Sequence, residues 1–385
     1  MTLAERLEAL HALGREHVAP HAAAVDAEAR FPREAFDALK EAGWLSSYVP
    51  VELGGWGLSV SEVGRACEAL AAYDGSVAMI FAMHQIQVAC IVHHSLHEPT
   101  WQAFCRELVE RQLLLASATT ELGIGGDVRT SGCHVAREGA RFRLEKKAPV
   151  ISYGLESDAI LVTARKDADA AASDQVHVVV RRDQAQLEPL SSWDTMGFRG
   201  TCSLGFVLRA EGDANQVLPV PYAQIHTKTM HPFSHSVWAS LWLGMASEAV
   251  RRARAVVRKQ ARKSPDRPPP SALRLAEVDA QLSVFAALVH DTVRDYEARL
   301  VASGDEPFPS DFDFASRVNN LKVKSSELVV DVVGRALLIC GISGYRNDSK
   351  GSLARILRDA YGAALMVNND RILLQSATMQ IVRRG

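Results

Sequence analysis

The chain has 385 residues, of which 48% are hydrophobic and 23% are charged, and its formal net charge at pH 7 is -2. This length leaves room for two or three domains, and the near-neutral charge argues against a chain-wide attraction to nucleic acid or to an anionic membrane, which need a net basic surface. The six cysteines lie far apart without a C-x-x-C pair, so neither a zinc site nor a disulfide framework is expected.

Residues 1–113 have the apolar periodicity of helices, and we expect them to form an N-terminal helical domain. The N-terminus itself, M-T-L-A-E-R-L-E-A-L, carries acids where a leader would be basic and apolar. No apolar run approaches the roughly 18 residues that a membrane span needs. A cytoplasmic protein without a membrane partner is therefore expected, and the histidines His93, His94 and His97 are assigned to an exposed turn.

The pattern changes in residues 114–222, where short β-branched segments are separated by turn residues. These segments predict strands at 141–145, 158–164, 176–180 and 203–208. We expect this middle region to form a small, β-barrel-like domain.

Residues 223–385 return to helical spacing and predict a C-terminal four-helix bundle, whose helices each bury one face. The segment S-P-D-R-P-P-P-S (264 to 271) should separate two of these helices, because proline removes a hydrogen-bond donor and clashes in a helix interior. The whole chain is thus predicted to be an α+β protein that is mainly α. Two long apolar stripes carry the prediction of the bundle: Leu275, Val278, Leu282, Phe285, Val289, Val293, Tyr296 and Leu300, then Val318, Leu321, Leu328, Val332 and Ile339.

This order of domains, with G-I-S-G-Y-R-N-D (341 to 348) and the Arg-Asp-Ala triplet at 358–360, resembles the acyl-CoA dehydrogenase family over nearly the whole chain. The resemblance implies the family's fold, FAD as cofactor, and an acyl-CoA or acyl-carrier-protein substrate. It also implies an electron acceptor, either electron-transfer flavoprotein or oxygen, and assembly as a homodimer or homotetramer.

The segment T-T-E-L-G-I-G-G-D (119 to 127) is similar to the family's T-E-P-G-x-G-S-D loop. The resemblance implies that Thr120 bonds the pyrimidine edge of a flavin, and that Gly125 and Gly126 let the backbone approach the ring. Ser152 falls where a hydroxyl would bond the flavin near N5, and Val150 replaces a tryptophan that often stacks on the ring. Taken alone, a Gly-rich loop is more often a β-turn between a helix and a strand, and its position in this order of domains favours the flavin contact.

The resemblance places the adenosine half of FAD against two further segments. Arg262 could pair with the pyrophosphate, although the Phe-Gly that usually follows is missing. Gly341 and Gly344 would serve the cofactor of a neighbouring subunit, with Leu338 standing where relatives have glutamine.

The position of the family's catalytic base is occupied by Val367, which cannot take a proton and keeps only its backbone N–H for polarising a carbonyl. The base that some relatives carry earlier in the bundle aligns with Ser234. We therefore consider His235 as a general base, with His231 one helical turn away on the same face and able to contact substrate. The two could also bind a metal, for which no third ligand is identified, or be structural histidines.

Two further residues are candidates. Asp370 follows shortly after Val367 and is either an alternative base or a helix-end carboxylate. His84 lies on the helix that borders the acyl pocket in relatives, and we expect it to touch the substrate.

Three hypotheses for the function follow. The first is an FAD-dependent dehydrogenase that acts on the CH–CH bond of an acyl thioester with a relocated base. The second keeps the scaffold for a flavin monooxygenase or a non-redox lyase such as a desulfinase. The third is a non-catalytic flavoprotein or a nucleic-acid-binding relative that uses the eight basic residues between 251 and 267, which can also be a solvated helix face or a contact for FAD or CoA phosphates.

Overall fold

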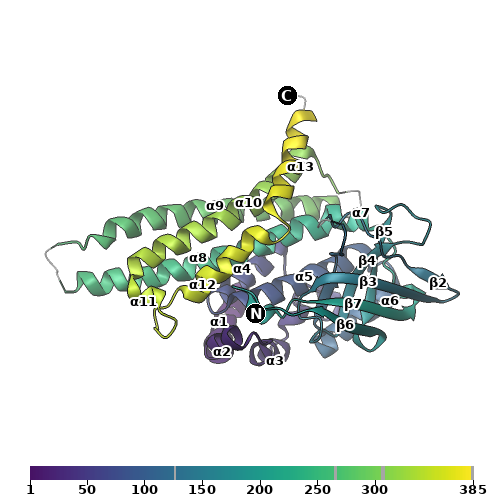
Figure 1. The fold of residues 1–385 in the computed structure, drawn as a ribbon, viewed down its shortest axis with the longest axis horizontal. Coiled ribbons are helices and arrows are strands. Elements are labelled where there is room, and N and C mark those ends of the chain that lie inside the picture. Colours follow the sequence, from purple (N-terminus) through teal and green to yellow (C-terminus); the bar gives the residue numbers. More distant parts are fainter. Residues whose placement is uncertain (125–126, 264–266, 305–307, 383–385) are drawn as a thin grey trace.

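The computed structural model describes residues 1–124, 127–263, 267–304 and 308–382. The predicted order of a helical part, a part made of β-strands and a helical bundle is confirmed (Figure 1). The bundle extends to one side of the molecule and the strands lie on the other (Figure 1). The candidate site described below lies where these parts meet.

Helices form the N-terminal part, and polar side chains mark where some of them begin. Thr2 and Ser59 each close a capping box with Glu5 and Glu62, which pairs backbone donors that a helix end leaves free. A buried apolar core holds these helices together. They are α1 Leu3–Leu13, α2 Ala22–Glu28, α3 Arg33–Glu41, α4 Val60–Ala71, α5 Gly75–Ser95 and α6 Pro99–Arg111.

The middle part contains two sheets. Strands β1 (Leu115–Ala118), β4 (Ala159–Arg165) and β5 (Gln175–Arg181) form the first sheet, in which β1 is parallel to β4 and β4 antiparallel to β5. The second sheet is antiparallel, in the order β2 Ala136–Glu138, β3 Arg141–Ile151, β7 Leu204–Asp213 and β6 Ala185–Ser191.

The strands that the sequence predicted are β3, β4, β5 and β7. In β3, exposed and buried side chains alternate over most of its length, which is the pattern that revealed it. Strands β1 and β2 are short and β6 is mostly exposed, so none of the three gave a clear signal.

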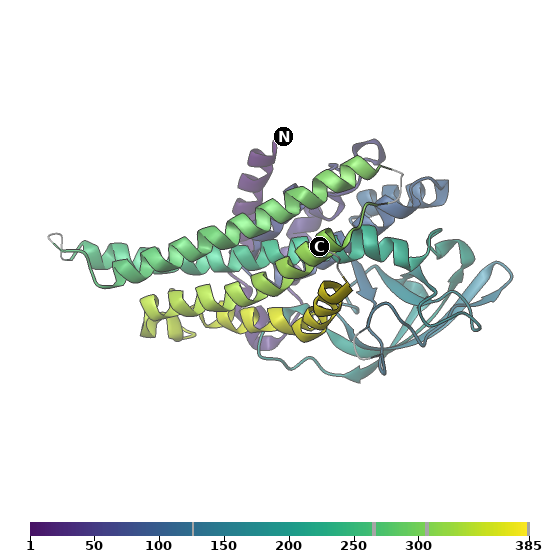
Figure 2. The ribbon, with the colours of Figure 1, turned by 90° about the horizontal axis from the view of Figure 1, so that it is seen from above.

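The C-terminal part is built on helices α8 (His231–Ala261), α9 (Ser271–Ser303) and α10 (Phe312–Cys340), which run side by side (Figure 2). Residues 267–270 of the proline-rich segment lie between α8 and α9, and both predicted apolar stripes face the core. Helix α12 packs against α8 and α10 and completes the bundle. The shorter elements are α7 Tyr222–Ile225, α11 Ile342–Tyr345, α12 Ala354–Leu365 and α13 Asn369–Val382.

Helix α5 corrects two expectations. It is long and apolar enough to cross a membrane, contrary to our estimate from apolar runs, but 89% of its most apolar window is buried inside the protein. It packs against α4, α8 and β1, so its apolar surface is taken up within the fold. His93 and His94 belong to this helix and not to an exposed turn, and the His94 Nε2 lies 2.8 Å from Thr229 Oγ1.

Helix α12 is tied to the N-terminal part through the Arg-Asp-Ala triplet. Asp359 and Asp74 are both buried, and Arg355 Nη1 lies 3.3 Å from a carboxylate oxygen of Asp74. Arg358 forms an ion pair with Asp26 on α2. We call these five side chains the Arg–Asp junction. It fixes the course of α12 and therefore of the turn that follows it.

Candidate functional site

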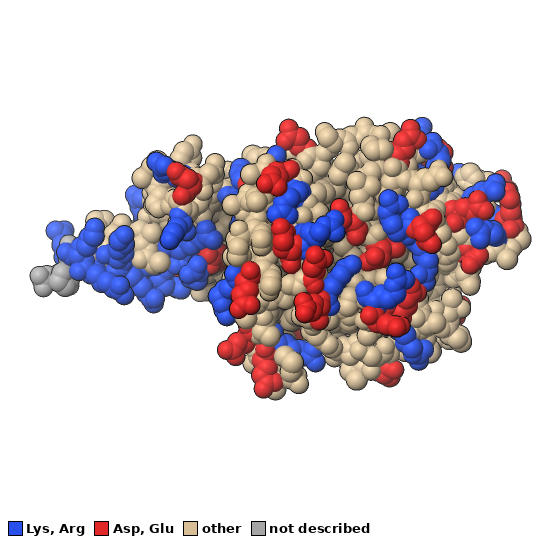
Figure 3. Space-filling model, turned by 90° about the horizontal axis from the view of Figure 1, so that it is seen from below, with Lys and Arg blue, Asp and Glu red and all other residues tan. Residues whose placement is uncertain are grey.

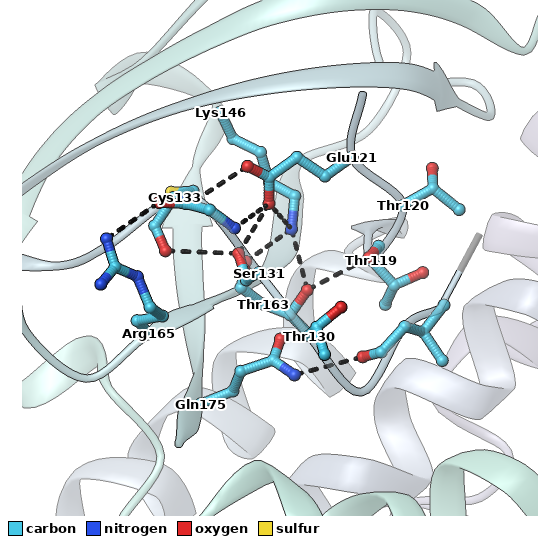
Figure 4. Close-up of polar contacts among 12 residues, drawn as sticks. Thr119, Thr120, Glu121, Thr130, Ser131, Cys133, Lys146, Thr163, Arg165 and Gln175 are labelled. Atoms are coloured by element: carbon cyan, nitrogen blue, oxygen red, sulfur yellow. Dashed lines mark hydrogen bonds and ion pairs between the residues drawn. The ribbon is translucent and has the colours of Figure 1, made fainter. Parts of the chain in front are cut away.

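The Gly-rich loop after β1 is anchored by the carboxylate of Glu121, whose side chain is 10% exposed (Figure 4). Glu121 accepts hydrogen bonds from Ser131 Oγ at 2.6 Å and from the backbone N–H groups of the next two residues at 3.2 and 2.8 Å. The Nζ of Lys146, on β3, lies 3.7 Å from the same carboxylate and donates to the carbonyl and the hydroxyl of Thr163 at 2.6 and 2.9 Å. Burial lowers the pKa of this lysine. Both ends of the loop are thereby fixed to the sheets.

Hydroxyl groups and exposed apolar side chains lie together beside this loop. Thr120 Oγ1 lies 3.5 Å from the carbonyl of Val150, and Ser152 Oγ accepts from Ser203 Oγ at 2.8 Å. Leu122 is 53% exposed and Val150 is 37% exposed. Apolar surface next to hydroxyl groups fits a flavin ring, whose faces are apolar and whose pyrimidine edge and N5 form hydrogen bonds. Thr120 and Ser152 would hold those polar atoms.

Of the glycines in this loop, Gly125 and Gly126 lie outside the described residues, so their predicted contact with the cofactor stays a prediction. Gly123 has a φ of +93° and open space where a Cβ would stand. The loop can therefore approach a planar ring with its backbone at this point.

Three histidine rings, which we call the histidine row, lie next to one another before and at the start of α8. The rings of His226 and His231 are stacked with centroids 5.5 Å apart, and those of His231 and His235 meet edge to face at 4.5 Å. A π-helical turn directly before α8 brings His226 beside His231, its neighbour five positions along the chain. Asn319 Oδ1 lies 3.0 Å from His231 Nε2, and the carbonyl of Val318 lies 3.3 Å from His235 Nδ1.

Burial keeps the histidine row uncharged. Desolvation lowers the pKa of His226 to about 3, that of His231 to about 4 and that of His235 well below 6.5. Repulsion from His231 lowers the pKa of His226 and His235 further, and the charge of Arg371 does the same for His231. At pH 7 each ring is therefore neutral, with one N–H donor and one acceptor nitrogen. His235 does not titrate near neutrality as the sequence suggested, and it is a weak base.

Lys322, on α10, is a site residue that sequence reasoning missed. The side chain is fully buried, and its Nζ donates to Asn369 Oδ1 at 2.6 Å and to the carbonyl of Ala364 at 3.5 Å. It thus joins the end of α12 to the start of α13. Burial lowers its pKa to about 7, and the charge of Arg371 acts in the same direction. Its place directly after Leu321, inside an apolar stripe, was the hint in the sequence.

The turn that Lys322 spans presents Val367. This residue has a φ of +56°, in the left-handed region that β-branched residues rarely adopt. Within the described part of the chain, its backbone N–H donates no hydrogen bond, while its carbonyl accepts one from Arg371 at 3.4 Å. Asp370 is exposed in the first turn of α13, where a carboxylate suits the helix dipole. The charges of Lys322 and Arg371 lower pKa values in the histidine row, so the turn lies beside that row.

His84 corrects a prediction. Its ring lies in the core, with Nε2 2.6 Å from the carbonyl of Leu45 and Nδ1 accepting from the N–H of Leu115 at 3.0 Å. Both nitrogens are used by the backbone, and burial lowers the pKa of His84 to about 4. His84 is therefore a structural histidine that joins β1 to the N-terminal helices and not a contact for the substrate.

The residues assigned to the adenosine half of FAD lie at the far end of the bundle. Arg262 follows α8, and the rise of the helix places it about 40 Å from His235. Gly341, with φ +60°, has open space at the end of α10. Gly344 is needed for packing, because a Cβ there would lie 2.6 Å from that of Cys340. One chain does not bring these residues together with Thr120, so a shared ligand would require a second copy.

The same end of the molecule carries a dense group of basic side chains (Figure 3). Some of its arginines are paired, as Arg254 is with Asp279. Others are exposed and form no ion pair within the described ranges: Arg258, Lys259, Arg262, Lys263, Arg267 and Arg274. The surface suits phosphate groups, and it lies away from the histidine row.

The described part of the chain was compared with what a metal site or a reactive thiol requires. Searched over those residues, no three or more His, Cys, Asp or Glu side chains come together in a way that could hold a metal ion. The two histidines of the predicted H-x-x-x-H pair, His231 and His235, meet edge to face with ring centroids 4.5 Å apart. All six cysteines are free thiols, and burial raises the pKa of most of them.

A helical domain, a two-sheet domain with a hydroxyl-lined loop and a helical bundle define a class of flavin-dependent oxidoreductases. The chain belongs to the acyl-CoA dehydrogenase family. The family model described as "Acyl-CoA dehydrogenase, N-terminal domain" matches residues 4–110, and "Acyl-CoA dehydrogenase, C-terminal domain" matches residues 229–375. The resemblance and the fold predicted from the sequence are thus confirmed. Members of the family bind flavin.

Similar proteins differ in their reactions. The chain is 26% identical over 361 residues to "Probable acyl-CoA dehydrogenase FadE25" of Mycobacterium tuberculosis, covering 92% of this chain and 89% of that one. It is also 26% identical over 353 residues to the amino sugar nitrososynthase DnmZ of Streptomyces peucetius, covering 89% and 84%. The FMN-bound structure of TdsC, a dibenzothiophene monooxygenase from Paenibacillus sp. A11-2, superposes with a TM-score of 0.83 at 18% identity, covering 98% and 97%.

Proposed function

We propose that the protein is a flavin-dependent monooxygenase built on the acyl-CoA dehydrogenase fold. It would take up flavin reduced by a separate reductase, insert one atom of dioxygen into an organic substrate and release the other as water. The observation that carries this proposal is the histidine row, because its rings are buried and uncharged at neutral pH.

Dehydrogenation of an acyl thioester begins with the removal of a weakly acidic α proton, which needs a base with a pKa near the working pH. Val367 offers no such group, and the depressed pKa of His235 makes it a poor substitute. Oxygen insertion does not require this proton. Neutral imidazoles instead give a dry site that orients a substrate by hydrogen bonds.

The chain's own residues would have distinct tasks in this reaction. When bound, reduced flavin would supply the two electrons that activate dioxygen. Thr120 and Ser152 would orient the ring, His231 and His235 would bond the substrate and exclude water, and Lys322 would hold the turn that closes the site. Relatives with the names of a nitrososynthase and a monooxygenase support the same reading.

A second candidate is the FAD-dependent acyl-thioester dehydrogenase, and two features of the turn favour it. The unpaired N–H of Val367 could polarise a thioester carbonyl, and Lys322 is an amine whose pKa is about 7. In this case FAD would extend to the basic end of another copy in a dimer or tetramer. The cofactor's identity, the assembly and a cytoplasmic location are part of the proposal.

The two candidates are separated by two assays on the purified full-length protein. With a flavin reductase, NADH, and FMN or FAD, a monooxygenase consumes oxygen in step with product, tested on a panel of heteroaromatic and amine substrates. A dehydrogenase is instead bleached by an acyl-CoA when oxygen is absent. Anaerobic bleaching without oxygen-dependent turnover would reject the monooxygenase.

Lys322→Met is expected to lower turnover at least tenfold and to lower the free energy of unfolding by about 1–3 kcal/mol, because the apolar side chain fills the space of the lysine but leaves the acceptors of Asn369 and Ala364 without this donor. The ammonium form is present below pH 7 and donates most strongly to Asn369. Wild-type turnover should therefore fall as the pH rises through about 7. A pH–rate profile of the variant should lack this limb.

His235→Phe is expected to lower turnover at least tenfold and to leave the pH limb near 7 in place. The reason is that the pKa of His235 lies well below 6.5, so the ring contributes a hydrogen bond and no titration in this range. Loss of the limb in the phenylalanine variant would identify His235 as the base and contradict the assignment of the limb to Lys322.

A further inference from the structure

Arg371 is a partly buried cation in the first part of α13, and its donors are incompletely used. Its side chain is 26% exposed, Nη1 lies 3.7 Å from Asp127 Oδ1, and Nη2 makes a long contact of 3.4 Å to the carbonyl of Val367. The Nε atom is buried and has no hydrogen-bond partner among the residues that the structure describes. A buried donor without a partner costs free energy, and it commonly marks a position that an ion, water or ligand fills.

The carboxylate next to Arg371 is already shared. Asp127 Oδ1 also accepts from the backbone N–H and the Nε of Arg129, at 3.1 and 3.3 Å. One aspartate thus faces two guanidinium groups, and the 3.7 Å separation from Arg371 is longer than a direct hydrogen bond. Desolvation lowers the pKa of Arg371 by more than the charge of Asp127 raises it. The loss of water around this cation is therefore not fully offset by the carboxylate beside it.

Among the described residues, the charges that act on the pKa of Arg371 are those of Asp127, which raises it, and Arg129, which lowers it. The charge of Arg371 lowers the pKa values of His226 and His231, which are neutral, and that of Lys322, which lies across the turn. The described groups whose charges act on one another here are three cations, Arg371, Arg129 and Lys322, and one carboxylate, that of Asp127. An oxyanion at this place would pair with the guanidinium fork and find the free N–H of Val367 in the same turn.

We propose that the substrate of this site carries an oxyanion, either a carboxylate or a phosphoryl group, which pairs with Arg371 in place of Asp127. This inference rests on the proposed function only in taking the histidine row as the place where the substrate lies. The anion would fix the substrate's orientation, since a bidentate pair constrains direction as well as distance. Arg371 is then a residue that determines specificity.

The test is anion binding to the purified full-length protein, measured by isothermal titration calorimetry without turnover. Propionate and inorganic phosphate are the anionic probes, and propionamide is the neutral match for propionate. Wild type is expected to bind at least one anion and to ignore the amide. Arg371→Gln should weaken that binding at least tenfold, because it removes the charge and the fork. Asp127→Asn should strengthen it, because it removes the competing carboxylate.

Two controls make the outcome decisive. Arg294→Gln changes an arginine that is 71% exposed on α9, and it should leave anion binding unchanged. Thermal unfolding without ligand checks that the Arg371 variant is folded, and the opposite sign expected for Asp127→Asn provides a second measurement. Equal binding of anions by wild type and Arg371→Gln would overturn the inference.

The cofactor's own phosphate is the competing source of an oxyanion. If Arg371→Gln weakens the binding of FMN and not that of riboflavin, Arg371 serves the cofactor and the assignment to the substrate is overturned. These binding experiments can fail while oxygen-dependent turnover is observed, so failure of the inference and failure of the proposed function are distinguishable.

Discussion

Glu121→Ala is expected to lower the free energy of unfolding by about 3–5 kcal/mol, the usual cost of breaking a buried ion pair from one side. The substitution removes the acceptor of the Ser131 hydroxyl and of two backbone N–H groups. It also leaves the ammonium of Lys146 buried without a carboxylate. Urea denaturation followed by circular dichroism and fluorescence measures the loss. Flavin affinity should fall at least tenfold, because the loop that carries Thr120 loses its anchor.

A matched control lies on the same sheet. Glu145 pairs with Arg209 at 2.7 Å, but both side chains are about half exposed, so Glu145→Ala should cost less than about 1 kcal/mol. Adding Lys146→Met to Glu121→Ala removes the stranded charge, and the double variant should be more stable than Glu121→Ala alone. If Glu121→Ala costs no more than Glu145→Ala, the ion pair does not anchor the loop.

The sequence predicted the elements whose packing is regular. The stripes of α9 and α10 and the alternation in β3 follow directly from burying one face of a helix or sheet. Strand β1 pairs with β4, which is distant in sequence, whereas β2 forms a short hairpin with β3, and the few residues of β1 and β2 carry no periodicity of their own. Helix α5 is buried on all sides, so its composition alone resembles that of a membrane span.

The candidate site was predicted in part. The loop at 119–127 and the position of Val367 were found from motifs, and the structure places the histidine row beside the turn that carries Val367. His226 was missed because a spacing of five residues shares no face of an α-helix, and a π-helical turn is not visible in a pattern. Glu121 and Lys322 were missed because burial, which decides their importance, comes from tertiary contacts with Lys146 and with the turn after α12.

His84 and His235 differ in a way that no sequence pattern reveals. Both are buried and both have depressed pKa values. The nitrogens of His84 are both used by backbone groups, whereas His235 has a single long contact and belongs to a row of rings. The free hydrogen-bonding capacity of a histidine, and not its burial, separates a structural ring from a candidate site ring.

Asp359→Asn is expected to make the protein more stable at pH 8 and to flatten the dependence of stability on pH. Desolvation, and then the charge of Asp74, raise the pKa of Asp359 from 3.8 to about 7. The folded state therefore binds this proton more tightly than the unfolded state does. Stability from this group is complete below about pH 4, declines as the pH rises and is lowest above about pH 7.

A pKa difference of roughly three units corresponds to about 4 kcal/mol at pH 8. Asparagine cannot ionise, and its Oδ1 can still accept the 2.6 Å hydrogen bond from the N–H of Phe198. The stability gain should therefore approach, but not reach, this figure at pH 8, and it should vanish near pH 4. Urea denaturation at pH 4, 6 and 8 measures the stability gain at pH 8 and its disappearance near pH 4.

Asp348 provides the comparison, since it is an exposed carboxylate whose pKa is lowered by Arg346 and whose effect on stability has the opposite sign. Asp348→Asn should leave the decline in stability between pH 4 and 8 unchanged.

Asp74 also has a raised pKa, so the two buried carboxyl groups of Asp74 and Asp359 titrate as a pair, and the decline in stability can shift to Asp74 in the Asp359→Asn variant. A residual slope after Asp359→Asn that disappears in the double variant with Asp74→Asn would assign the proton to the pair. An unchanged slope in the double variant would exclude the Arg–Asp junction as its source.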